Sequence, residues 1–168
     1  MFLRATSVSS KNQAMDKIAL RILAELRRDG RIANTELAQK VGLSESACLR
    51  RVRQLEADGL IERYMARLNL SKLGWGMSLL VRITLKAQTD RDLRIFERAV
   101  SAVPEITDCF LTTGEADYVL RVFARDAADI ERLHGAVLTK LPGVARVESS
   151  FVLREIVSGA TPPIERGT

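Results

Sequence analysis

Three arginines, Arg50, Arg51 and Arg53, lie close together in this 168-residue chain. A guanidinium group carries a fixed positive charge and can donate paired hydrogen bonds to phosphate oxygens or to the edge of a guanine base. The cluster could therefore bind a nucleic acid. Because an arginine-rich helix face often contacts only water, the cluster by itself leaves both interpretations open.

The charge of the chain is unevenly distributed. Residues 1–73 contain 14 Lys and Arg against 8 Asp and Glu, whereas residues 74–168 contain 12 against 13, within a total net charge of +5. Only the first part is basic, so only this part is expected to meet a polyanion such as double-stranded DNA. A basic surface without a partner remains the alternative on charge alone.

Residues that could support metal or covalent chemistry are few and far apart. The chain has two cysteines, Cys48 and Cys109, and one histidine, His134, without the spacing of a zinc site. The cysteines fit small apolar residues on buried faces, and His134 fits the surface or boundary of a helix. We predict no catalytic residue, no metal and no cofactor.

The chain also lacks membrane and export signals in its sequence. No apolar run approaches the roughly 20 residues that a membrane span needs, and residues 1–10 do not resemble a secretion signal. Because the two cysteines lie far apart and form no Cys-x-x-Cys pair, the chain is predicted to be cytoplasmic, without a membrane partner. We expect residues 1–14 to be a flexible lead-in, with Met1 or Met15 as the start.

The first elements that must position the arginines are two short helices. Residues 16–28 carry one apolar stripe at helical spacing. Asp29-Gly30 is expected to end this helix, with the glycine in a left-handed conformation. Asn34 or Thr35 is expected to cap a second helix, because either side chain can accept from free backbone N–H groups.

A third helix then carries the arginine cluster. Ser44 is its predicted N-cap, residues 45–58 form it, and Gly59 ends it. The small residues Ala38 and Gly42 allow the second and third helices to pack at a steep angle, as a helix-turn-helix requires. The predicted buried edge of the third helix consists of Cys48, Val52 and Leu55.

The exposed side of the third helix is the predicted contact surface for DNA. In helix-turn-helix proteins the first turn of this helix, here Ser44–Ser46, enters the major groove. Residues 60–68 are predicted to be extended, as a wing and connector that brings Arg63 and Arg67 toward the DNA backbone.

The second part of the chain has the pattern of a sheet with two helices. Apolar and polar residues alternate from Met77 to Leu85, which predicts a half-buried strand. Asp90 is expected to cap a helix that Pro104 ends. The elements predicted next are a strand at 106–113, a turn at 114–117, a strand at 118–124, a helix at 127–140 and a strand at 144–157.

This order is strand-helix-strand repeated twice, which indicates a ferredoxin-like βαββαβ domain and an α+β fold class overall. Both helices would cover one face of the sheet, so the other face needs a second subunit as its cover. The predicted parts are a winged helix-turn-helix at 15–62, a linker at 63–74, the ferredoxin-like domain at 75–157 and a mobile tail at 158–168.

Several short segments resemble the Lrp/AsnC (feast/famine) family of transcription regulators. The family commonly has a proline near the start of the third helix, where this chain has Glu45, so base specificity is not carried over. The resemblance covers nearly all of residues 15–157 and is carried by Asp29–Ala38, Val41–Ser44, Cys48–Val52, Leu55-Glu56 and Gly59–Ile61.

The resemblance implies a regulator with a RAM-type C-terminal domain that binds a small molecule. Members pair sheet to sheet as homodimers, and the dimers can assemble further into tetramers or octamers. The DNA-binding residues are predicted to be Thr35, Ser44, Glu45, Ser46, Ala47, Arg50, Arg51, Arg53 and Arg63. An amino-acid effector is predicted at Thr112, Thr113, Gly114, Glu115, Asp117 and Tyr118.

In this hypothesis Asp117 pairs with the ammonium group of the amino acid, while turn N–H groups around Gly114 and the hydroxyls of Thr112 and Thr113 meet its carboxylate. Glycine and aspartate are also ordinary turn residues, so a turn without a ligand is the alternative. Two other functions stay open: an enzyme resembling the decarboxylases of haem precursors, and an architectural protein that coats DNA. The operator, the effector and the sign of regulation are left open.

Overall fold

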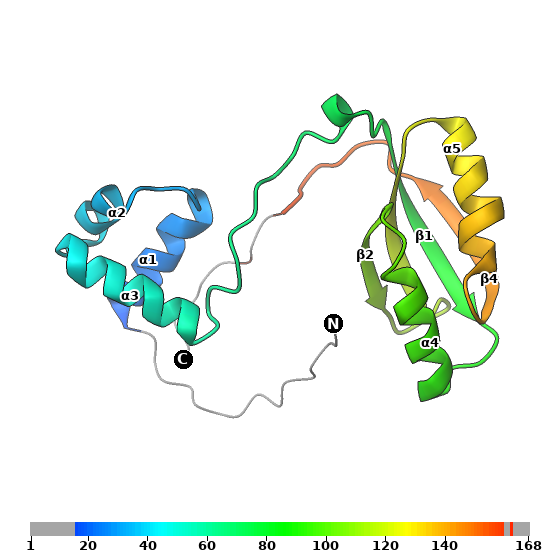
Figure 1. The fold of residues 1–168 in the computed structure, drawn as a ribbon, viewed down its shortest axis with the longest axis horizontal. Coiled ribbons are helices and arrows are strands. Elements are labelled where there is room, and N and C mark those ends of the chain that lie inside the picture. Colours follow the sequence, from blue (N-terminus) through cyan, green and yellow to red (C-terminus); the bar gives the residue numbers. More distant parts are fainter. Residues whose placement is uncertain (1–15, 160–161, 163–168) are drawn as a thin grey trace. The chain divides into compact units, whose positions relative to one another are not determined.

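The computed structural model describes residues 16–159 and 162, which form two compact units (Figure 1). The first unit runs to Arg67 and also includes Gly159, and the second spans Leu68–Ser158. The lead-in predicted at 1–14 and most of the tail predicted at 158–168 lie outside the described residues.

Three helices make up the first unit: α1 (Lys17–Arg28), α2 (Asn34–Val41) and α3 (Glu45–Ala57). They enclose one apolar core. The core is centred on Ile22 and Cys48, both fully buried. Gly42 ends α2 with a φ of 76°, in the left-handed region that favours glycine, and so allows the tight turn into α3. This confirms the predicted helix-turn-helix.

Two side chains join α1 to α3. Asp16 is the N-cap of α1, and its Oδ1 accepts from the Ala19 N–H at 2.7 Å. Its other oxygen, Oδ2, lies 2.5 Å from Nη1 of Arg51 on α3. The Ala19 N–H and the Arg51 guanidinium hold the pKa of the Asp16 carboxyl below its usual value. One carboxylate thus closes the start of α1 and pairs with α3.

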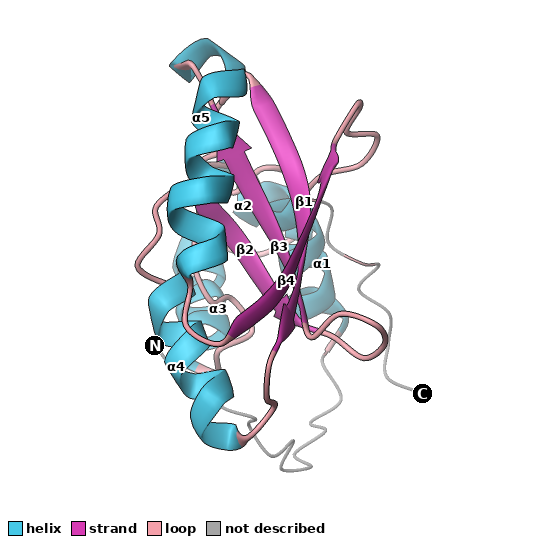
Figure 2. Ribbon diagram, turned by 90° about the vertical axis from the view of Figure 1, so that its right-hand side faces the viewer, coloured by secondary structure: helices cyan, strands magenta, loops and turns pink. Residues whose placement is uncertain are grey.

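The second unit is a four-stranded antiparallel sheet with helices on one face (Figure 2). Its order is β2-β3-β1-β4, the order of a ferredoxin-like fold, which confirms the predicted class. The elements are β1 (Met77–Leu85), α4 (Asp90–Val100), β2 (Ile106–Leu111), β3 (Tyr118–Ala124), α5 (Ala127–Arg132) and β4 (Val144–Phe151).

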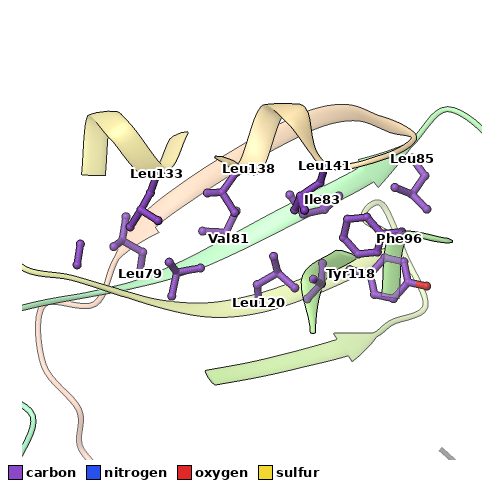
Figure 3. Packing of buried hydrophobic residues seen from close by; sticks show 13 residues of the cluster. Leu79, Val81, Ile83, Leu85, Phe96, Tyr118, Leu120, Leu133, Leu138 and Leu141 are labelled. Carbon is purple, nitrogen blue, oxygen red and sulfur yellow. The ribbon is translucent and has the colours of Figure 1, made fainter. Parts of the chain in front are cut away.

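The core of this unit lies between the sheet and its helices (Figure 3). Alternate residues of β1 and β3 point into it, and Val81 pairs with Leu120 across the two strands. The rings of Phe96 and Tyr118 pack against each other, with centroids 4.5 Å apart. The period-two alternation predicted for residues 77–85 is confirmed, because every second side chain from Leu79 onward is buried.

Two predicted N-caps and the predicted conformation of one glycine were wrong. The N-cap of α2 is Ala33, without a side-chain cap, because the Asn34 amide donates instead to the carbonyl of Glu45. The N-cap of α4 is Thr89, whose Oγ1 accepts from the Asp92 N–H at 3.3 Å, so Asp90 lies in the first turn. Gly30 does not adopt a positive φ; α1 ends on Asp29 in an extended conformation.

The second predicted helix of this unit, at 127–140, is not a uniform α-helix. After α5 the chain forms a π-helical turn at Leu133–Val137 and a short 3-10 turn at Leu138–Lys140. A π turn spans more residues than an α-helical turn, so Leu138, five residues after Leu133, is buried while Val137 is only half-buried. Leu133, Leu138 and Leu141 therefore supply the buried side chains from this segment.

Two extended segments also differ from the predictions. The last strand ends at Phe151, not at residue 157, since its partner β1 begins at Met77 and only the Val152 N–H still donates to Ser78. The wing and connector was predicted at residues 60–68. From residue 62 onward this segment runs as an extended loop (Figure 1), and it pairs with no other strand among the described residues.

The Asp16 cap yields a first prediction. Asp16→Ala should lower the stability of the first unit by about 1 kcal/mol, because it removes the N-cap as well as the ion pair. Asp16→Asn should cost less, since asparagine can still cap the helix. Amide hydrogen exchange of α1 at neutral pH measures both variants.

The effect of Asp16 should also depend on pH. The lowered pKa means that folding favours the ionised carboxylate, so its stabilising effect is present at neutral pH and disappears as the pH falls through that lowered pKa. The difference between wild type and Asp16→Asn should then shrink in acid. An equal difference at every pH would contradict the role of the charge.

Candidate functional site

Two polar side chains fix the start of α3, one by accepting a backbone hydrogen bond and the other by donating one. Ser44 is the N-cap, as predicted, and its Oγ accepts from the Ala47 N–H at 3.3 Å. Asn34 at the start of α2 donates from Nδ2 to the carbonyl oxygen of Glu45 at 2.9 Å. The second contact, which the sequence did not indicate, holds the first turns of α2 and α3 together.

The exposed face of α3 is defined here as Ser46, Leu49, Arg50 and Arg53. Leu49 and Arg50 follow Ser46 by three and four positions, and Arg53 follows them by four and three, so the four residues lie along one side of the helix. All four are exposed. Neither Arg50 nor Arg53 forms an ion pair with any described residue, which leaves two guanidinium groups available to a polyanion.

Arg51 differs from its two neighbours. It was predicted to bind DNA, yet it is half-buried and its guanidinium pairs with the cap residue Asp16. One residue further along a helix turns the side chain by about 100°, which takes Arg51 off the face shared by Arg50 and Arg53. Its contact points to a structural role between α1 and α3.

The other predicted DNA-binding residues lie around this face. Thr35 is exposed in the first turn of α2, Glu45 is exposed in that of α3, and Ala47 beside it is half-buried. Arg63 is exposed in the extended segment after α3. That segment is held to the helix by Tyr64, whose hydroxyl donates to Glu56 Oε1 at 3.0 Å.

The turn between β2 and β3 contains the other predicted site. Gly114 has a φ of 123°, a conformation that L side chains rarely adopt. Thr112 closes the turn: its N–H donates to the Asp117 carbonyl at 2.8 Å, and its hydroxyl donates to the Ala116 carbonyl at 2.9 Å. Thr113, Gly114 and Glu115 are exposed at the tip.

Asp117 and Tyr118 both have structural partners. Asp117 Oδ2 accepts from the Leu85 N–H at 2.7 Å and from the Gln88 amide at 3.5 Å, which ties the turn to the end of β1. The Tyr118 ring lies in the core, and its hydroxyl donates to Glu97 Oε1 at 3.0 Å. Three polar groups of the predicted ligand site therefore already form hydrogen bonds within the fold: the Thr112 hydroxyl, Asp117 Oδ2 and the Tyr118 hydroxyl.

The nucleophilic side chains near this turn are held in their neutral forms. Burial raises the pKa of the Cys109 thiol to about 11, with a smaller contribution from the Glu97 carboxylate. Burial, followed by the hydrogen bond to Glu97, raises the pKa of the Tyr118 hydroxyl. A thiol with a raised pKa is a poor nucleophile, because only the thiolate is reactive.

Neither a metal centre nor a membrane helix occurs in the described part of the chain. Among its residues, no three His, Cys, Asp or Glu side chains come together as metal ligands. None of the helices in that part has the length and apolar character needed to cross a membrane.

Comparison with known protein families gives one match in the N-terminal part of the chain and one in the C-terminal part. Residues 15–62 match the family described as winged helix-turn-helix DNA-binding. Residues 78–162 match the family described as Lrp/AsnC ligand binding domain. The two matches fall on the parts that contain α3 and the β2–β3 turn.

Curated relatives agree with this assignment. The chain is 42% identical over 150 residues to the Bkd operon transcriptional regulator of Pseudomonas aeruginosa. The aligned region covers 89% of this chain and 98% of the relative. It is 39% identical over 146 residues to the leucine-responsive regulatory protein of Haemophilus influenzae, covering 87% and 88%.

Solved structures give the same result. A transcriptional regulator from Neisseria meningitidis, determined as an L-Met complex, superposes with a TM-score of 0.83 at 35% identity, covering 88% of this chain and 96% of that chain. An AsnC family regulator from Agrobacterium tumefaciens gives 0.80 at 32% identity, covering 86% and 94%.

These relatives regulate transcription and are not enzymes, so the hypothesis of a haem-precursor decarboxylase is not supported. The family matches, the relatives and the shared two-part fold lead to the same assignment. The chain is a transcription regulator of the Lrp/AsnC family, with an N-terminal winged helix-turn-helix for DNA and a C-terminal ligand-binding domain.

Proposed function

We propose that this regulator binds double-stranded DNA as a homodimer through the exposed face of α3, under the control of an amino acid bound at the β2–β3 turn. The observation that carries the proposal is the exposed face itself. It presents Arg50 and Arg53 without an ion-pair partner among the described residues, on the helix that a helix-turn-helix inserts into the major groove.

On DNA, the polar residues of this face and those around it are proposed to make different contacts. Arg50 and Arg53 donate to phosphate oxygens or bidentately to guanine. Ser46 and the cap Ser44 lie at the N-terminus of α3, where backbone N–H groups and the helix dipole favour an approaching phosphate. Arg63, exposed after α3, adds a contact to the DNA backbone.

The amino acid is proposed to bind at the exposed tip of the turn. Its ammonium group pairs with Glu115 and with Asp117 Oδ1, to which no described residue donates a hydrogen bond. Its carboxylate meets the N–H groups around Gly114 and the hydroxyl of Thr113. The L-Met complex of the Neisseria relative supports an amino acid as the class of ligand.

The homodimer is proposed from the uncovered face of the sheet, defined here as the face opposite α4 and α5. In the strand register, Leu80 of β1 and Phe110 of β2 lie on this face and are 41% and 57% exposed. Exposed apolar side chains of this size favour a second protein surface as their cover. A dimer also supplies two copies of α3, which suits a palindromic operator.

The proposed location is the cytoplasm, where a regulator of this family meets the DNA that it controls.

The DNA proposal predicts the behaviour of a double variant. Arg50→Ala/Arg53→Ala should weaken DNA binding and lower the slope of log K against log salt by about 0.9 for each phosphate that the variant no longer neutralises. Fluorescence anisotropy on a labelled promoter fragment, at several salt concentrations, measures both effects. Arg91→Ala/Arg94→Ala on α4 removes the same charge from the second unit and should leave affinity and slope unchanged.

An unchanged slope in the Arg50→Ala/Arg53→Ala variant would show that another surface binds DNA. Footprinting against random DNA separates the proposed function from the architectural alternative. A protein that protects all sequences equally would be a DNA-coating protein rather than a sequence-specific regulator.

The ligand proposal predicts that Asp117→Asn weakens amino-acid binding by about tenfold or more, because the variant cannot form the charge-assisted hydrogen bond to the ammonium group. The asparagine oxygen can still accept from the Leu85 N–H, so the turn should remain folded. Titration calorimetry with L-leucine and L-methionine measures the affinity, and thermal unfolding verifies the fold. Asp90→Asn, at an exposed position of α4, is the control. Equal affinities in wild type and Asp117→Asn would place the ligand elsewhere.

The dimer proposal predicts that Phe110→Asp shifts the protein toward monomers, because it places a charge in an apolar interface. Sedimentation velocity over a concentration series measures the change. Ile95→Asp is the matched control, since Ile95 is also exposed, at 41%, and lies on α4 away from the uncovered sheet face. Dimers that resist Phe110→Asp but dissociate with Ile95→Asp would indicate that the helical face forms the contact.

A further inference from the structure

The exposed face of α3 contains one apolar residue, Leu49, between the polar and charged ones. Leu49 is 40% exposed, and Ser46, Arg50 and Arg53 adjoin it on the helix. Its neighbours Cys48 and Val52 pack into the core of the first unit, whereas Leu49 is not among the residues of that core. Core packing therefore does not account for the leucine.

The surface that this face meets in the proposed complex limits what Leu49 can contact. The edges of base pairs in the major groove carry hydrogen-bond donors and acceptors, and one apolar group, the C5-methyl of thymine. Contacts with the sugar and phosphate groups are the same for every base and give no preference among sequences. A leucine in the groove is removed from water, and among the base edges the thymine methyl offers it an apolar surface in return.

Leu49 also lies in the part of α3 that reaches the bases. It is the fifth residue of a helix that starts at Glu45, so it lies in the second turn, next to the turn that enters the groove. Arg50 follows Leu49 directly, and Arg53 lies about one turn further along α3. Both long side chains can anchor the DNA next to Leu49, so the apolar contact lies beside two positive charges.

We infer that Leu49 is a specificity-determining residue of the operator contact, which selects thymine at one position of each half-site through the C5-methyl group. The inference rests on the proposed placement of α3 in the major groove. Arg50 and Arg53 bind phosphate oxygens or guanine. Leu49 supplies a preference for thymine that their charges cannot, because a methyl group has no hydrogen-bond acceptor for a guanidinium group.

The test removes the methyl group alone. High-affinity duplexes are selected from a randomised pool with the full chain, and each thymine is then replaced in turn by deoxyuridine. Wild type should bind about fourfold more weakly when one particular thymine of a half-site is replaced, the value of one buried methyl-sized group. Leu49→Ala should bind the thymine and deoxyuridine duplexes equally well.

Two variants serve as controls. Leu60→Ala truncates a leucine that is 49% exposed and lies after the end of α3, so it should keep the sensitivity of the wild type to deoxyuridine. Arg50→Ala/Arg53→Ala should weaken binding to each thymine duplex and to its deoxyuridine counterpart by the same factor. Thermal unfolding verifies that Leu49→Ala remains folded.

The inference is overturned if no thymine responds to deoxyuridine, or if Leu49→Ala retains the response. Failure of the proposed function has a different signature. In that case no duplex is enriched by selection, or Arg50→Ala/Arg53→Ala binds as tightly as wild type, and the role of Leu49 is rejected together with the assigned face.

Discussion

The rest of this molecule depends on a sheet that has helices on one face only. In β1 and β3 every second side chain is buried beneath α4 and the α5 segment, so the intervening side chains point to the opposite face. That face keeps large apolar groups such as Leu80 and Phe110 in contact with water. The same alternation that builds the core of one subunit thus creates the surface on which the proposed dimer rests. A dimer in turn supplies the second α3 that a symmetric operator requires.

Within the first unit, three neighbouring arginines have different roles because a helix turns each successive side chain by about 100°. Arg51 points back to the N-cap of α1 and pairs with Asp16. Arg50 and Arg53 remain on the exposed face. The contact between Asp16 and Arg51 stabilises α1 against α3, which keeps the exposed face in a fixed position on its support.

In the second unit, Asp117 connects the proposed ligand site to the sheet. Its carboxylate accepts from the backbone of Leu85 at the end of β1, and its own N–H donates to the Ile83 carbonyl. A charged ligand at the turn would act on a residue that also fixes the end of a central strand. In the proposed function, this connection is the route by which an amino acid alters the contacts of the second unit.

The sequence by itself determined the order and class of the elements. Helical spacing of apolar residues, period-two alternation in 77–85 and the turn at Gly42 are local properties, and they predicted both units correctly. The missing side-chain cap of α2 and the end of β4 depended on contacts more distant in sequence, such as those of Asn34 with Glu45 and of Val152 with Ser78. The partners of the site residues also depended on the tertiary structure. By residue type alone, Arg51 was equivalent to Arg50 and Asp117 was a ligand contact. Only the tertiary structure placed Asp16 beside Arg51 and Leu85 beside Asp117, because each of these partners lies more than 30 residues away in the chain.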